Sequence, residues 1–187
     1  MRRTTVLGAV LLFSSVLAGE DSDVAGMESK LQHLQSNAAA TPVDTSPTDF
    51  SEREINSYLA AGKVDLPEGV QSVKFQGQPG IIMATAHVDF DVIKAGRSSM
   101  NPLLSVFSGI HDIVVVAHAQ GGGHEGVVHV DSVSLDGVQI PRFVLASFIE
   151  KYLQPKYPRV GLDSRFSLPE KLDTAAVGEQ KVTVTQK

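Results

Sequence analysis

The chain has 187 residues, a formal net charge of −5 and no cysteine. Because no disulfide can form, its stability must come from a packed hydrophobic core. The acidic balance and the lack of any lysine or arginine run argue against a nucleic-acid partner, which needs a basic surface.

The N-terminal segment 1–19 has the order of a secretory signal peptide: two arginines, an apolar run and then small residues. Its apolar run is shorter than the about 20 residues that a membrane-spanning helix requires. Twin-arginine export is a poorer match, because Thr4, Thr5 and Val6 follow the arginine pair. We expect cleavage near Ala18 and a periplasmic or secreted mature chain without a transmembrane span.

The rest of the chain divides into two parts. Residues 20–47 combine a short helical pattern around 27–34 with a flexible linker over 36–47, whose small residues and prolines can bury little surface. Residues 48–187 are predicted to form a single domain.

The first helix of this domain is predicted to begin after Ser51. Ser51 and Glu54 have the spacing of a capping box, and Phe50 with Ile55 can close a hydrophobic staple across it. Gly62 suits the position that follows a helix, so the helix is expected to end just before it.

Strand patterns dominate the middle of the chain. Apolar and polar residues alternate strictly from 82 to 92, which predicts a half-buried antiparallel strand. The run 113–119 is apolar on both faces and predicts a central strand, with 126–135 as its hairpin partner. Asp136 and Gly137 form a strong turn pair directly after it.

A second amphipathic helix is predicted from Pro141 to Gln154. Pro141 suits the first helical position, and Pro155 stops the helix. The apolar stripe consists of Val144, Leu145, Phe148, Ile149, Tyr152 and Leu153. Phe143 lies outside this stripe, among polar residues, and is expected to be exposed.

A short motif occurs twice, each time after a predicted helix. Leu-Pro-Glu at 66–68 and again at 168–170 precedes similar segments, with Val70 aligned to Leu172. Either the chain contains a helix-plus-hairpin repeat or this brief match is fortuitous. Together the elements predict an α+β fold in which a curved antiparallel β-sheet packs against two amphipathic helices.

The segment GGGHEGVVHVDSV, 121–133, is the one that most resembles a chemical site. His124 and His129 flank Glu125 in a near match to a zinc-peptidase motif, whose histidines stand four residues apart on a helix. The spacing of five puts these two histidines on different faces of a helix or a strand. The glycines lack the lysine of a phosphate-binding loop, so we interpret them as a bend with positive φ.

A metal site is a weaker hypothesis for His87, His118 and His129. Folding could bring their strands together, and imidazoles bind divalent metals or take up protons at mildly acidic pH. The interpretation we favour places all three on the solvent face of a sheet. The chain also lacks cysteine and a G-x-S-x-G elbow, so we expect neither a cofactor nor enzymatic activity.

An apolar ligand site is predicted between the second helix and the sheet. A sheet that curls around a helix can leave an apolar trough for an acyl chain or a similar ligand. The expected lining is Val144, Leu145, Phe148, Ile149, Tyr152 and Leu153 of the helix, with Val88 and Phe90 of the sheet. The alternative is that these side chains only complete the core.

Three motifs carry a family resemblance: FSEREINSYLA at 50–60, LPEGVQSV at 66–73 and VDSVSLDGVQIP at 130–141. Their order resembles that of small exported envelope proteins of the YpmS and LmeA kind, over roughly residues 50–184. This resemblance implies a curved sheet that wraps a helix, akin to tubular lipid-binding modules. It carries no catalytic residue.

Three functional hypotheses result. The leading one is an exported, non-enzymatic protein of the cell envelope that binds a lipid or another apolar small molecule. The second is a protein–protein interaction or scaffold module of the envelope. The third is a metal-dependent enzyme built on His87, His118 and His129.

Overall fold

The computed structural model describes residues 14–95, 100–169 and 171–187. Most of the predicted signal peptide, 1–13, therefore lies outside the described residues. Within those ranges, no helix combines the length and the apolar character that crossing a bilayer requires. The elements are α1 (Ser14–Ala38), β1 (Thr48–Ser51), α2 (Glu52–Ala60), β2 (Val70–Gln78), β3 (Ile81–Asp89), α3 (Phe90–Lys94), η1 (Pro102–Val106), β4 (Ile110–Gly122), β5 (Glu125–Leu135), β6 (Val138–Gln139), α4 (Arg142–Phe148), η2 (Ile149–Leu153), β7 (Asp163–Ser167), β8 (Leu172–Gly178) and β9 (Lys181–Gln186).

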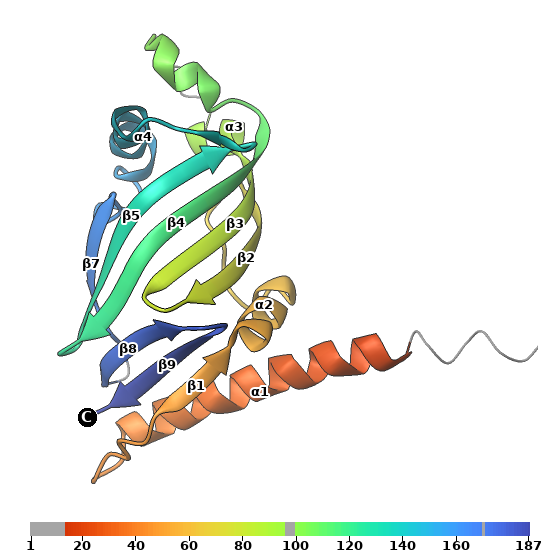
Figure 1. Cartoon of the computed structure of the whole chain (residues 1–187), viewed down its shortest axis with the longest axis vertical. Helices are drawn as coiled ribbons and strands as arrows, with labels where there is room; N and C mark the ends of the chain where they lie inside the picture. Colours follow the sequence, from red (N-terminus) through yellow and green to blue (C-terminus); the bar gives the residue numbers. More distant parts are fainter. Residues whose placement is uncertain (1–13, 96–99, 170) are drawn as a thin grey trace, which may run out of the picture.

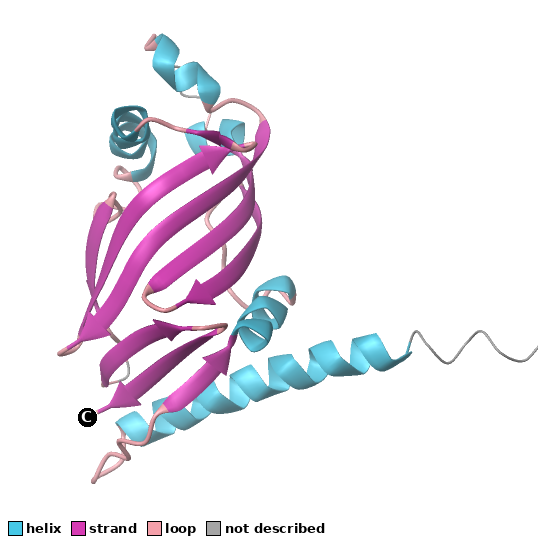
Figure 2. Cartoon of the chain, in the orientation of Figure 1, coloured by secondary structure: helices cyan, strands magenta, loops and turns pink. Residues whose placement is uncertain are grey.

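The strands form one large antiparallel sheet that does not close into a barrel. Its order is β1-β9-β8-β4-β3-β2, and β5 pairs with the other side of β4 as well as with β6 and β7. Figure 1 shows α1 and α2 at one end of this curved sheet, and α3, α4 and η1 at the other. The division into helices and strands (Figure 2) confirms the predicted α+β class.

Two hairpins lie end to end along the long strand β4. Strand β3 pairs with β4 as far as Ile81, which faces His118, and β8 continues the pairing where Ala175 faces Gly121. The tip of one hairpin bonds to the tip of the other, because the Gly80 N–H donates to the Val177 carbonyl at 2.9 Å. The sheet is therefore continuous across the two hairpins.

These hairpins share the geometry that the repeated motif predicted. In each copy the N–H of the aligned residue, Val70 or Leu172, donates to the carbonyl of the motif proline, Pro67 or Pro169, at 2.9 Å. Each copy then shifts register immediately afterwards. The same turn and the same bulge in both copies favour a genuine helix-plus-hairpin repeat, with β7 inserted after the second helix.

Helix α2 begins with the predicted capping box. The Ser51 hydroxyl accepts from the Glu54 N–H at 3.2 Å, and the Ser51 N–H donates to the Glu54 carboxylate at 2.8 Å. Phe50 and Ile55 lie in one hydrophobic cluster, as the staple predicted. Gly62, at φ +66°, follows the end of the helix.

Helix α2 also protects the edge of the sheet. Asn56 bonds to both the N–H and the carbonyl of Phe75 in the edge strand β2, at 2.7 and 2.8 Å. The Glu52 carboxylate accepts from the Gly77 N–H of the same strand at 3.1 Å. These side chains form hydrogen bonds with backbone groups of the edge strand that would otherwise be free to pair with a strand of another chain.

Helix α1 differs from the short helical segment and flexible linker expected over 20–47. It is 25 residues long, and Leu34 is buried in a second hydrophobic cluster with Phe50 and Val184. Asn37, also buried, donates to Gln186 at 2.6 Å, so the end of the helix is anchored to β9. The local pattern missed this because α1 has only a weak apolar face and depends on tertiary contacts.

Strand β3 ends earlier than the alternation to residue 92 predicted. The Asp89 carboxylate accepts from the N–H groups of Asp91 and Val92, at 2.9 and 3.2 Å, and thereby starts α3. Phe90 keeps its predicted inward position, but Val92 turns to the surface. An N-cap has overridden a strand-like pattern here.

The larger hydrophobic core lies between α4 and the concave face of the sheet. Its buried members are Ala86, Val88, Phe90, Leu104, Phe107, Leu135, Ile140, Val144, Phe148 and Tyr152. This core includes residues of η1 and α3, so α4, the second predicted helix, does not cover the sheet alone.

Candidate functional site

One wall of the candidate site is formed by α4 and its continuation η2. As predicted, the helix begins directly after Pro141, but its hydrogen-bond pattern changes halfway. From Ile149 the helix widens into one π-helical turn, in which the Gln154 N–H donates to the Ile149 carbonyl at 2.9 Å. The predicted helix over 141–154 is thus present, but it is not uniformly α-helical. Single π turns of this kind are frequent at functional sites.

The opposite wall is the concave face of β3, β4 and β5. Register pairs Ala86 with Ile113 and Ile113 with Leu135, so their side chains point to the same side as Val88. Val115 and Val133 form the next cross-strand pair on that side. The result is a continuous aliphatic surface that faces α4.

A cavity of about 310 Å³ lies between these two walls. Seven of the eight predicted lining residues border it, namely Val88, Phe90, Leu145, Phe148, Ile149, Tyr152 and Leu153. The eighth, Val144, is instead buried in the adjoining core. A volume at the lower end of the usual range for ligand pockets suits one small or single-chain ligand.

Phe148 is the centre of a group of four aromatic rings that border the cavity. The Phe148 ring centroid lies 4.2 Å from that of Phe107, 5.5 Å from that of Phe90 and 5.2 Å from that of Tyr152. Such aromatic pairs contribute about 0.5–1.5 kcal/mol each beyond the burial of their area. Phe107, at the end of η1, was not predicted as a lining residue because no periodicity connects it to the helix or the sheet.

The segment after η2 supplies a part of the lining that the sequence did not indicate. Tyr157, Val160 and Leu162 border the cavity, although about two fifths of the surface of the first two is exposed. The segment contains Pro158 and leads into β7, and no helix or strand is predicted for it. The apolar residues of this segment were the sequence feature that could have indicated its part in the lining.

Two charged residues of opposite sign border the cavity. Among the described residues that border the cavity, only Glu68 and Lys156 are charged, and their side chains form an ion pair at 2.6 Å. The hydrogen bond from the Lys156 ammonium, and then its charge, lower the pKa of the Glu68 carboxyl below its usual value. Both side chains reach solvent, so the pair marks the rim of an otherwise apolar space.

The candidate metal ligands do not meet. His118 faces His129 across β4 and β5, but His87 lies six residues along β3 from Ile81, the residue that faces His118. Each of the three pairs with an aspartate instead: His87 with Asp112, His118 with Asp131 and His129 with Asp163. Within the described ranges, no group of three or more histidine, aspartate or glutamate side chains is placed to hold a metal ion.

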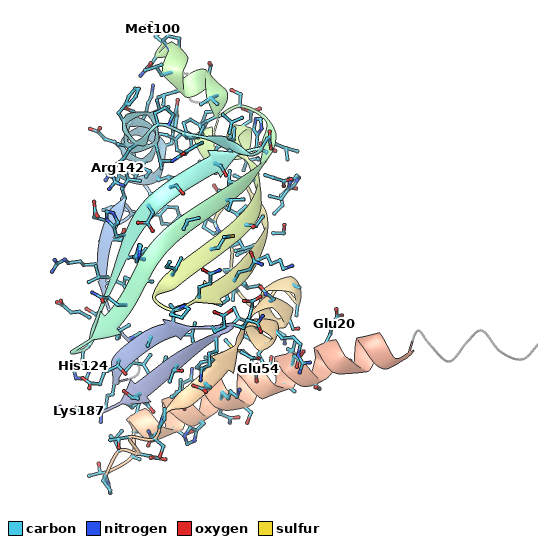
Figure 3. All side chains as sticks on the ribbon, in the orientation of Figure 1. Glu20, Glu54, Met100, His124, Arg142 and Lys187 are labelled. Carbon is cyan, nitrogen blue, oxygen red and sulfur yellow. The ribbon has the colours of Figure 1, made fainter. Side chains whose placement is uncertain are left out.

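The glycine run is a hairpin turn, as the bend interpretation predicted. Gly123 and His124 take φ values of +62° and +65°, the backbone of a two-residue turn between β4 and β5. His124 lies at the tip of this hairpin, far from Met100 at the opposite end of the molecule (Figure 3). His124 lies in this turn beside the Leu172 carbonyl, whereas His129 lies in β5 beside Asp163, so the two histidines of the zinc-peptidase pattern do not share a face.

Comparison with protein-family models, with curated proteins and with solved structures finds no match for this chain.

Proposed function

We propose that this protein is an exported, non-enzymatic carrier that binds a lipid-like or other apolar small molecule in the cavity beneath α4. The observation that carries the proposal is the cavity itself, which is bordered by aliphatic and aromatic side chains on both walls. Export is supported by the order of residues in segment 1–19. The resemblance to envelope proteins of the YpmS and LmeA kind is in keeping with this proposal.

The energetics favour a ligand with a chain of methylene groups. Each methylene that moves from water into an apolar space contributes about 0.8 kcal/mol. About ten of them would contribute about 8 kcal/mol, against which the cost of association is subtracted. Few fixed hydrogen-bond partners are needed, because the head of such a ligand stays in water.

A binding experiment with a cavity-filling variant tests the proposal. Leu153 borders the cavity and is only partly buried, so Leu153→Trp should fill the space and still fold. Phe143→Trp, on the exposed side of the neighbouring helix α4, is the matched control. We expect a fluorescent fatty acid to bind the wild type and the control, and to bind Leu153→Trp at least about tenfold more weakly.

Native mass spectrometry of protein purified from its own host supplies a second readout. Release of a lipid from the wild type, and its absence from Leu153→Trp, is the expected result. Equal uptake by all three proteins, or no uptake by the wild type, contradicts the proposal.

An interaction module is the second candidate, and exposed apolar residues favour it. Met100, Leu103 and Ile110 are largely exposed around η1, which projects from one end of the molecule (Figure 1). Such a group can mark a protein contact. Leu103→Glu should then abolish co-purification of a stoichiometric protein partner and leave fatty-acid uptake unchanged.

The metal-dependent enzyme gains no support from the geometry. His87 is remote from the other two histidines along the strand, and each imidazole already faces a carboxylate. We therefore do not propose it.

A further inference from the structure

The rim of the cavity holds two opposite charges from distant parts of the chain. Glu68 belongs to the connection between α2 and β2, and Lys156 follows η2, yet the ammonium and the carboxylate are 2.6 Å apart. Both residues border the cavity. The ion pair thus lies where an apolar ligand would meet solvent.

An amphiphile would place its head group at this pair. Its chain gains free energy by entering the apolar space, whereas a charged head is costly to bury and stays near water. The head of such a ligand therefore comes to rest beside Glu68 and Lys156. One of the two must exchange its partner for the ligand.

The geometry indicates which partner leaves. The side chain of Glu68 is 72% exposed and that of Lys156 is 38% exposed, so Lys156 is the more firmly held at the rim. A mostly exposed carboxylate can turn into solvent at little cost, since ion pairs at the surface contribute little to stability.

Resting on the proposed function, we infer that the ligand is an anionic amphiphile with an apolar chain and a carboxylate or phosphate head. Lys156 binds the head, and Glu68 occupies the site of the head when the cavity is empty. A charge-assisted hydrogen bond from an ammonium to such a head is among the stronger polar contacts available to a protein. Glu68 is then a built-in competitor, and its removal strengthens binding.

Competition against a fluorescent fatty acid tests this inference. Four ligands share one ten-carbon chain, the length that the cavity volume accommodates, and differ in the head: decanoate, decyl phosphate, decanol and decylamine. The measurements are made at about pH 8, where the carboxylic acid is ionised. Wild type, Lys156→Gln and Glu68→Gln are compared with Lys181→Gln, which removes the lysine of a different surface ion pair, the one with Asp49.

We expect the wild type and Lys181→Gln to prefer the two anions over the alcohol by about tenfold. Lys156→Gln should lose this preference and keep its affinity for decanol, whereas Glu68→Gln should bind the anions more tightly. Equal binding of acid and alcohol, a preference for the amine, or an unchanged preference in Lys156→Gln overturns the inference and leaves the apolar carrier standing. Failure of all four ligands to bind the wild type overturns both.

Discussion

The ring of Phe148 in α4 lies 4.2 Å, centroid to centroid, from the ring of Phe107, which follows η1. This contact joins the helix to the connection between β3 and β4, and both rings border the cavity. Phe148 also packs edge-on against Phe90 at 5.5 Å. One side chain therefore holds three separate elements together.

Phe148→Ala should lower the free energy of unfolding by about 3–5 kcal/mol, because it leaves a cavity among rings that cannot all move in to fill it. Phe148 is 3% exposed, whereas Phe143 on the same helix is 62% exposed. Phe143→Ala is the control and should change stability by less than about 0.5 kcal/mol. Urea denaturation followed by circular dichroism measures both, and equal effects would contradict this account of the core.

A second relationship, between His111 and Asp136, makes stability depend on pH. The His111 Nδ1 lies 2.6 Å from the Asp136 carboxylate, and its Nε2 lies 2.7 Å from the Ser108 carbonyl. Because both partners are acceptors, only the protonated imidazole can donate to both. These two hydrogen bonds, first the one that His111 donates to the Asp136 carboxylate, raise the pKa of His111 above its ordinary 6.5.

The direction in which stability changes with pH follows from the shifts in these pKa values. A raised pKa in the folded state gives a stabilisation that is complete below about pH 6.5 and disappears as the pH rises through the folded-state value. For Asp136, hydrogen bonds from His111 and from the Asp112 N–H lower the pKa below 3.8. Its contribution is therefore present above about pH 3.8 and is lost in acid.

His111→Gln should thus destabilise the protein more at about pH 5.5 than at about pH 9. Urea denaturation of wild type and variant at both pH values measures the difference. In an Asp136→Asn background the pH dependence should shrink, since asparagine keeps an acceptor for the Asp112 N–H and tolerates the φ of +48° but carries no charge. An equal cost at both pH values would show that His111 is not protonated preferentially in the fold.

Local signals predicted the elements whose causes are local. The capping box at Ser51 and the turn at Asp136 each depend on neighbours within a few residues, and both are present. The apolar stripe predicted for 141–154 likewise identified residues that border the cavity, five of its six members, because an apolar face with period 3.6 must be covered by another part of the protein.

The remaining features depend on contacts between distant segments, which no local pattern encodes. Helix α1 is stabilised by a core that includes Leu34 and Val184, and Val184 belongs to the last strand of the chain. The ion pair of Glu68 with Lys156 requires the α2–β2 connection and the end of η2 to meet. The separation of His87 from His118 follows from strand register, which alternation alone leaves open.

The cap of α2 allows a prediction with an internal control. Ser51→Ala removes the acceptor of the Glu54 N–H and should cost about 1 kcal/mol of stability. Ser29→Ala, at an exposed position inside α1, should be neutral or slightly stabilising, since alanine is the better helix former. If thermal denaturation gives the same change for both variants, the capping box contributes nothing measurable.

The glycine run offers the sharpest local contrast, because two adjacent residues have opposite surroundings. A β-carbon on Gly121 would lie 3.0 Å from the Ala175 nitrogen and 3.1 Å from a Leu168 methyl, where β8 approaches β4. A β-carbon on Gly122 would meet nothing within 4 Å, and its φ is not in the left-handed region.

Gly121→Ala should therefore lower the free energy of unfolding by about 1–3 kcal/mol through overpacking against a backbone that is held by pairing. Gly122→Ala should raise it by about 0.4–1 kcal/mol, because alanine restricts the unfolded chain without straining the folded one. Urea denaturation of the two variants decides between a close approach of strands and mere flexibility as the reason for the glycines. A stabilised Gly121→Ala would mean that β8 yields, and that the pairing of Gly121 with Ala175 does not fix how the two hairpins join.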